Sequence, residues 1–230
     1  MSPHTVFIIF QFAVLIFAFC VHEAAHAWTA SRLGDQTARM LGRVTLNPAK
    51  HIDPLGSIIF PLIGAFYGGF LIGWAKPTPV TPRNFKHYTR DDILVTIAGP
   101  LSNLLMALVA LIILIAVKHT SHGLPALAAA LAFTEGQADA MTGGSILVPL
   151  LLFLYVSILI NLLLFVFNLF PIPPLDGSRV LIHFLPYRVQ ETYNRLGGWA
   201  LILLFLFGGR FIDMFYSPLL AIFQTALFRL

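Results

Sequence analysis

The residues whose types and spacing could do chemistry are His22, Glu23 and His26, which form the pattern HExxH. Residues four apart on a helix lie on one face, about one turn from each other, so both imidazoles could bind one Zn²⁺ ion. Glu23 could then act as the general base for the water that attacks in a hydrolysis. The alternative interpretation is a juxtamembrane helix end at which these three side chains have no catalytic role.

A catalytic zinc ion usually has three protein ligands and one open position, so a third ligand must come from elsewhere. Asp176 is the candidate, because it follows a charge-free run over residues 146–175 and precedes Gly177. The adjoining Pro173 and Pro174 would keep this backbone out of a regular helix. An ordinary turn aspartate after a helix fits the same spacing equally well.

The composition indicates a membrane protein. Of 230 residues, 58% are hydrophobic and 10% are charged, whereas a soluble domain has about 25% charged residues. This excludes a cytosolic enzyme, a disordered chain and a fibrous repeat, and the single cysteine excludes a disulfide scaffold. The net charge of +4 fits basic cytoplasmic loops. We expect no nucleic-acid partner, because basic and aromatic residues are not interleaved.

The apolar runs predict an α-helical polytopic membrane protein with three core transmembrane helices and at least one C-terminal membrane helix. These runs cover residues 5–33, 93–117, 146–175, 196–209 and 214–228. We expect one membrane-embedded unit, with a core over residues 5–185 and C-terminal membrane helices over residues 196–230. Whether residues 214–228 span the bilayer is left open.

The stretch Leu55–Gly73 is apolar but rich in glycine, with basic residues on both sides. A re-entrant segment would keep both basic flanks in the cytoplasm, as the positive-inside rule favours. The ends of the first and third core helices would then approach the same cytoplasmic face. Residues 37–46 and 71–82 are interpreted as weak strands of a small β-sheet on that side.

Three motifs together indicate a family. The chain resembles the site-2 protease family of intramembrane zinc metalloproteases, in a short form without a PDZ or regulatory domain. The matches are His22-Glu23-x-x-His26, Gly99-Pro100-x-x-Asn103 and Asn168-x-x-Pro171-x-Pro173-Pro174-x-Asp176-Gly177. Two intervening segments are similar to the same family, namely Asn47-Pro48-x-x-His51-x-Asp53-Pro54-x-Gly56 and, more loosely, residues 73–80.

The resemblance implies a role for each matched residue. One Zn²⁺ ion would be bound by His22, His26 and Asp176, with Glu23 as the base. Substrate would be bound by two amides: Asn168 would hold the substrate carbonyl or oxyanion, and Asn103 would contact substrate backbone. We interpret His51 as structural, because a catalytic zinc needs only three protein ligands.

The resemblance also implies a substrate and a place in the cell. The substrate would be a membrane-anchored protein cut within its transmembrane segment, as in regulated intramembrane proteolysis. The enzyme would lie in a bacterial inner (plasma) membrane, in contact with the lipid bilayer, with its active site toward the cytoplasm. Two other functions use the same residues, namely a membrane metal transporter and a non-catalytic scaffold that binds client proteins. The intact Glu23 argues against a scaffold, which needs no base.

Overall fold

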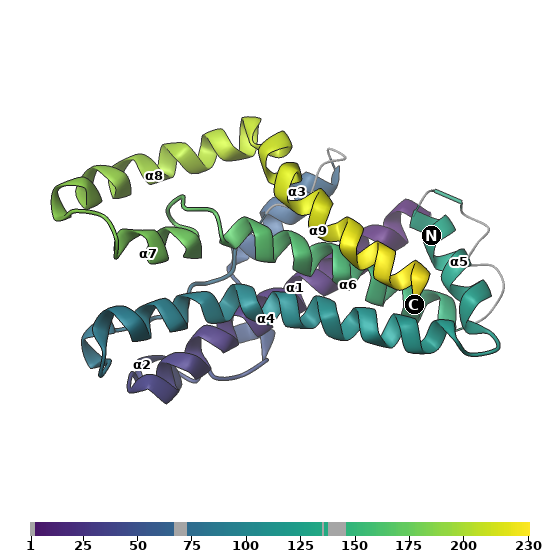
Figure 1. Ribbon diagram of the computed structural model, residues 1–230, viewed down its shortest axis with the longest axis horizontal. Helices are drawn as coiled ribbons and strands as arrows, with labels where there is room; N and C mark the ends of the chain where they lie inside the picture. Colours follow the sequence, from purple (N-terminus) through teal and green to yellow (C-terminus); the bar gives the residue numbers. More distant parts are fainter. Residues whose placement is uncertain (1–2, 67–72, 135, 138–145) are drawn as a thin grey trace.

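The computed structural model describes residues 3–66, 73–134, 136–137 and 146–230. Its centre is formed by three long helices that pack against one another, α1 (Pro3–Leu33), α4 (Tyr88–Lys118) and α6 (Leu147–Asn168) (Figure 1). Each is long and apolar enough to cross a bilayer, and so is α9 (Gly209–Arg229). The three predicted core helices are therefore confirmed as helices of membrane-crossing length.

Shorter helices surround this centre. They are α2 (Thr37–Met40), α3 (Phe60–Phe66), α5 (Gly123–Thr134), α7 (Asp176–Ile182) and α8 (Tyr187–Phe207), with single-turn segments η1 (Pro48–Lys50), η2 (Pro54–Ile59) and η3 (Pro82–Asn84). The pair α8 and α9 runs back along the molecule, and α9 packs on α6 (Figure 1). Helix α5 also packs on α6.

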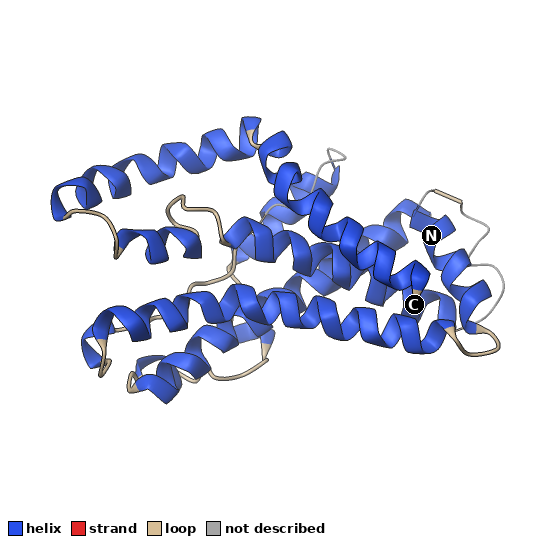
Figure 2. Cartoon of the chain, in the orientation of Figure 1, coloured by secondary structure: helices blue, strands red, loops and turns tan. Residues whose placement is uncertain are grey.

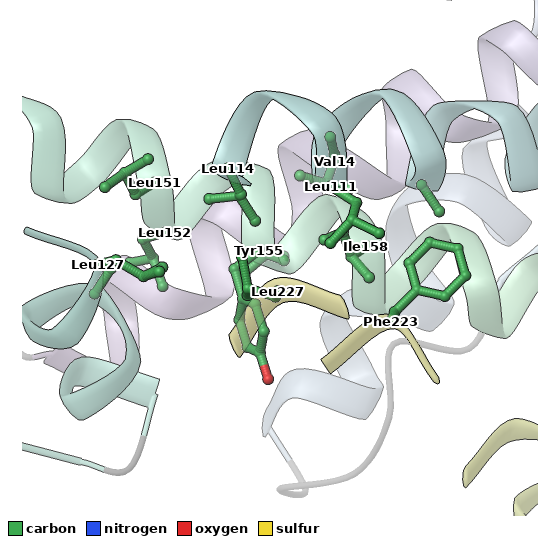
Figure 3. Packing of buried hydrophobic residues seen from close by; sticks show 14 of the residues in the cluster. Val14, Leu111, Leu114, Leu127, Leu151, Leu152, Tyr155, Ile158, Phe223 and Leu227 are labelled. Atoms are coloured by element: carbon green, nitrogen blue, oxygen red, sulfur yellow. The ribbon is translucent and has the colours of Figure 1, made fainter. Parts of the chain in front are cut away.

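The main apolar core lies between α1, α4, α5, α6 and α9 (Figure 3). Leu114, Leu151 and Leu152 are fully buried there. On the outer side of the same α4 helix, Leu105 is 61% and Ile112 is 64% exposed. Large exposed apolar side chains along the charge-free part of this helix, residues 93–117, are stable against lipid rather than water, so the exposed faces support the membrane assignment.

Two helix ends follow from local sequence. Gly34, directly after α1, has φ +118°, the left-handed region in which glycine is favoured. Helix α6 ends at Asn168, and residues 169–175 are irregular until α7 begins at Asp176. Proline lacks a backbone N–H and clashes with the preceding turn, so this predicted interruption before Asp176 is confirmed.

The predicted small β-sheet is wrong, because the described residues contain no strand (Figure 2). Residues 37–40 form the short helix α2 instead. Residues 73–81 are extended but pair with no neighbouring strand, and residues 71–72 lie outside the described part. The physical reason is that Pro77 and Pro79 remove ladder donors. Several of the remaining N–H groups bond to separate partners, including those of Trp74 to Gly56 O and Lys76 to His51 O.

The apolar stretch Leu55–Gly73 begins and ends at neighbouring positions in the structure. Trp74 N–H donates to Gly56 O at 3.1 Å. A Cβ atom on Gly56 would lie 2.4 Å from Trp74 Nε1, so only glycine allows the indole to pack on this turn. A hairpin also brings its two ends together in this way. Its insertion into a bilayer stays a prediction, and residues 67–72 lie outside the described part.

Candidate metal centre and active site

The three predicted ligands come from α1 and α7 and meet at one point. The Nε2 atoms of His22 and His26 are 3.0 Å apart. Asp176 Oδ2 lies 3.1 Å from His22 Nε2 and 3.4 Å from His26 Nε2. All three residues are buried or nearly so. Within the described part of the chain, they form a group whose ligand atoms lie within 4.8 Å of one another.

The tautomer of His26 is fixed by a backbone carbonyl. His26 Nδ1 lies 2.7 Å from Val95 O on α4. A carbonyl oxygen can only accept, so Nδ1–H is the donor. In the neutral ring, Nε2 then carries a lone pair that is directed at the meeting point of the three side chains.

The tautomer of His22 is fixed by a chain of buried amides. Asn161 Nδ2 donates to Ser157 O at 2.9 Å, which orients the Asn161 amide, because that carbonyl can only accept. Asn161 Oδ1 therefore accepts from Asn103 Nδ2 at 2.9 Å. Asn103 Oδ1 in turn accepts from His22 Nδ1–H at 2.6 Å. His22 Nε2 is thus left with its lone pair facing the same point.

These three ligand atoms fit a tetrahedral cation. Asp176 Oδ2 is buried and has no hydrogen-bond partner, although two ring nitrogens lie beside it. Three lone-pair groups at such separations repel one another unless a positive charge lies between them. Zinc–ligand bonds of about 2.0–2.1 Å in tetrahedral geometry put ligand atoms roughly 3.3 Å apart, which is close to the separations found here.

Gly99 on α4 provides the room for this centre. A Cβ atom at this position would lie 2.4 Å from His26 Nε2 and 2.6 Å from His22 Nε2. Those distances are too short for a carbon and a ring nitrogen in van der Waals contact. The added methyl group would occupy space between the two imidazoles, so glycine at this position keeps the meeting point of the ligands open.

Glu23 is held by the extended segment 73–81. Glu23 Oε2 accepts from Thr78 N–H at 2.7 Å, and Thr78 Oγ1 donates to the backbone oxygen of Glu23 at 3.0 Å. Glu23 is 9% exposed. The two contacts place its carboxylate in the same cavity as the predicted ligands, on the side where the wall is extended chain.

Asp35 anchors the far end of this extended segment. It is fully buried and accepts from Thr81 N–H at 2.7 Å and Asn84 Nδ2 at 2.8 Å. It also accepts from the hydroxyl and the N–H of Thr37. Burial alone would raise the pKa of Asp35, but these hydrogen bonds stabilise the charged carboxylate and hold its pKa below the usual value.

A cavity of about 360 Å³ adjoins the three predicted ligands and Glu23. Its wall includes Phe19, Leu164 and Trp74 as apolar groups and Asn168 as an amide. Asn168 Nδ2 donates to Leu164 O at 2.9 Å. An amide nitrogen carries two hydrogens, so a second N–H of Asn168 can serve a bound molecule.

Two other sequence predictions fall outside this cavity. Asn103 is fully buried behind His22 and is not among the residues that line the cavity. His51 is buried and lies outside the group of predicted ligands, with Nε2–H donating to Thr45 O at 2.8 Å. His51 also accepts from Lys76 N–H through its backbone oxygen, which ties its loop to the extended segment.

Sequence reasoning missed several residues that the geometry brings to the site. The signal for Asn161 was available, because a buried amide in a charge-free span is costly without a partner. Thr78 carried no such signal, since an extended segment without a partner strand has no periodic pattern. Asp92, which contacts Arg179 and His183, was also missed.

The chain is similar to a peptidase family and to proteins named zinc metalloproteases. The family model described as peptidase family M50 matches residues 10–207. A Bacillus subtilis (strain 168) protein named "Putative zinc metalloprotease YwhC" is 37% identical over 205 residues, covering 89% of this chain and 79% of that protein. No solved structure matches the chain.

Mycobacterial proteins named Rip2, with the same zinc metalloprotease description, are more distant relatives. The protein of Mycolicibacterium smegmatis (strain ATCC 700084 / mc(2)155) is 29% identical over 82% of this chain and 62% of its own length. That of Mycobacterium tuberculosis (strain ATCC 25618 / H37Rv) is 30% identical over 80% of this chain and 61% of its own length. The chain thus spans about three fifths of these two relatives.

Proposed function

The chain belongs to peptidase family M50, and we propose that it is an intramembrane zinc metalloendopeptidase whose site is built from His22, His26 and Asp176. The relatives named zinc metalloproteases support zinc as the metal. The observation that carries the proposal is the convergence of two ring nitrogens and one unpartnered carboxylate oxygen at separations of 3.0 to 3.4 Å. Three such ligands for one ion leave a fourth position open for chemistry.

Each polar group near this centre has a task in peptide hydrolysis. A bound zinc ion supplies Lewis-acid chemistry, which activates water and polarises a peptide carbonyl near neutral pH. Glu23 accepts a proton from the attacking water and returns it to the leaving nitrogen. The hydrogen bond from Thr78 N–H fixes one carboxylate oxygen of Glu23 and thereby orients the other oxygen. Asn168 donates to the substrate oxygen on which negative charge develops.

We assign Asn103 a positioning role in place of the substrate contact expected from the resemblance. Its side chain is enclosed between His22 and Asn161 and fully buried. Metal-binding histidines commonly donate their second ring N–H to such a partner, which fixes ring orientation. The substrate contact is then left to Asn168, which lines the cavity.

The proposed substrate is a membrane-anchored protein. The cavity lies among helices of membrane-crossing length and has a mostly apolar wall, which suits an apolar segment. A helical peptide hides each carbonyl in its own hydrogen bonds, so the segment must unwind before attack. We propose that the site faces the cytoplasm of a bacterial inner (plasma) membrane. The basic loops on both sides of residues 55–73 support this orientation, and the bacterial origin of the relatives supports this membrane.

The test compares wild type with Glu23→Gln in liposomes that contain a model single-span substrate. We expect the variant to bind zinc with unchanged stoichiometry but to cleave at least about 100-fold more slowly, as expected when general base catalysis is lost. Matched cleavage by the two proteins would contradict the role of Glu23. Zinc transport into sealed vesicles, unaccompanied by cleavage, would favour a metal transporter.

A further inference from the structure

Helix α4 supplies none of the proposed zinc ligands, yet one of its faces contacts both histidine ligands. Val95 O binds His26, Gly99 makes room for both imidazoles, and Asn103 binds His22. These three positions follow one another at intervals of four residues, so they share a face of the helix. Asp92 lies three residues before Val95 and extends the same stripe.

Asp92 joins α4 to the helix that begins with Asp176. Asp92 Oδ1 accepts from Arg179 Nη2 at 2.8 Å, and Asp92 Oδ2 accepts from His183 Nε2 at 2.8 Å. The Asp92 side chain is 7% exposed and that of His183 is 8% exposed. A carboxylate buried to this degree needs partners of this kind, so the two contacts form a firm link between α4 and α7.

The link acts on the face of α7 that carries Asp176. Arg179 and His183 follow Asp176 by three and seven residues, which puts all three on one side of a helix. The other side of this turn is closed by the end of α6, since a Cβ atom on Gly177 would lie 2.2 Å from Leu169 O. The rotation of α7 about its axis is therefore fixed from both sides.

We propose that Asp92 is the positioning residue of the third ligand, and this proposal rests on the proposed zinc site. It holds Arg179 and His183, and through them it turns Asp176 toward His22 and His26. The segment before α7, residues 169–175, is irregular. Its hydrogen bond from α8, in which the Tyr193 hydroxyl donates to Pro171 O at 2.9 Å, lies five residues before Asp176 and does not by itself set the angle of that carboxylate. Asp92 thus orients the aspartate ligand, as Val95 and Asn103 orient the two histidine ligands.

The experiment measures zinc affinity by chelator competition, using the full chain in detergent. Asp92→Asn removes the charge at nearly constant volume. We expect zinc binding about 10- to 100-fold weaker than in wild type, as for other residues that orient a metal ligand. With Co²⁺ in place of zinc, the visible absorption should shift toward that of Asp176→Ala. The double variant Arg179→Gln/His183→Gln cuts the same link from α7 and should give the same shift.

Asp91→Asn is the matched control. Asp91 is 2% exposed on the same turn of α4, but it accepts from His87 N–H at 2.9 Å and not from α7. We expect its zinc affinity and Co²⁺ spectrum to match wild type. Wild-type affinity in both Asp92→Asn and the double variant would overturn the positioning role, and so would equal weakening in Asp91→Asn. Wild-type affinity in Asp176→Ala would instead overturn the proposed zinc site itself.

Discussion

The cavity has two walls of different construction. One wall is helical and consists of α1, α4 and α6, in which His22 and His26 are held by groups from α4 and, through Asn103, α6. The other wall consists of the extended residues 73–81 and the irregular residues 169–175 that lead to Asp176. Here the attachments of residues 73–81 go to separate partners, such as Thr78 to Glu23 and Thr81 to Asp35.

The two walls of the cavity differ in which part of the site they hold. In the helical wall, buried polar groups have fixed partners along successive turns, so we expect small changes there to displace the proposed metal. In the irregular wall, the backbone itself lines the cavity, and Thr78 N–H contacts the proposed base. In the proposed site, the helices thus locate the ion, whereas the irregular wall leads to the third ligand and binds Glu23.

The largest effect on zinc binding from a change in the helical wall is expected at Gly99. Gly99→Ala would place a methyl group 2.4 to 2.6 Å from both imidazole Nε2 atoms. We expect loss of zinc binding by at least about 100-fold, since both ligands must move. Metal content after dialysis measures it, and Ala98→Gly on the same turn serves as the control. Wild-type zinc content in Gly99→Ala would mean that α4 does not limit the room around the ion.

A smaller effect is expected in the amide chain behind His22. Asn161→Leu leaves Asn103 without its acceptor, so the His22 ring loses its fixed orientation. We predict zinc affinity about 10-fold weaker.

In contrast, Asn168→Ala should lower the cleavage rate with zinc affinity unchanged, because Asn168 lines the cavity but contacts no proposed ligand. If the two variants gave the same pattern, the distinction between positioning and substrate contact would be wrong.

The smallest effect concerns the anchor of the irregular wall. Asp35→Asn removes a charged acceptor of buried hydrogen bonds, which should cost about 1–3 kcal/mol of stability. The lowered pKa of Asp35 means that its contribution is full above its usual pKa of 3.8 and is lost as pH falls through the lower value in the folded state. The difference in melting temperature between the variant and wild type should therefore shrink in acid. A difference that is the same at neutral and acid pH would contradict the charge as its cause.

The sequence predicted the helical wall better than the irregular one. The spacing of His22 and His26 and the charge-free runs are periodic signals, and the helices that they predict are present. The prolines before Asp176 also marked the end of α6 correctly. Residues 73–81 were interpreted as part of a sheet, because β-branched and apolar composition does not reveal whether a partner strand exists. Their actual partners, such as His51 and Asp35, lie far away in the sequence.

The side chains behind the site were also beyond the sequence alone. Asn161 and Asp92 act through residues on other helices, and only the packing of α4 against α1, α6 and α7 brings these pairs together. The GPxxN motif was visible, but the reason for its glycine was not. That reason is the distance between α4 and the two imidazoles, which no local pattern encodes.

X-ray absorption at the zinc edge reports the ligands of the ion and so tests the site formed by His22, His26 and Asp176. For wild-type protein carrying one equivalent of zinc, we predict two imidazole nitrogens at about 2.0–2.1 Å with further light ligands that include a carboxylate oxygen. Asp176→Ala should lose the carboxylate contribution and keep both imidazoles. A zinc spectrum with a single imidazole, or one that is identical in wild type and Asp176→Ala, would contradict the site formed by His22, His26 and Asp176.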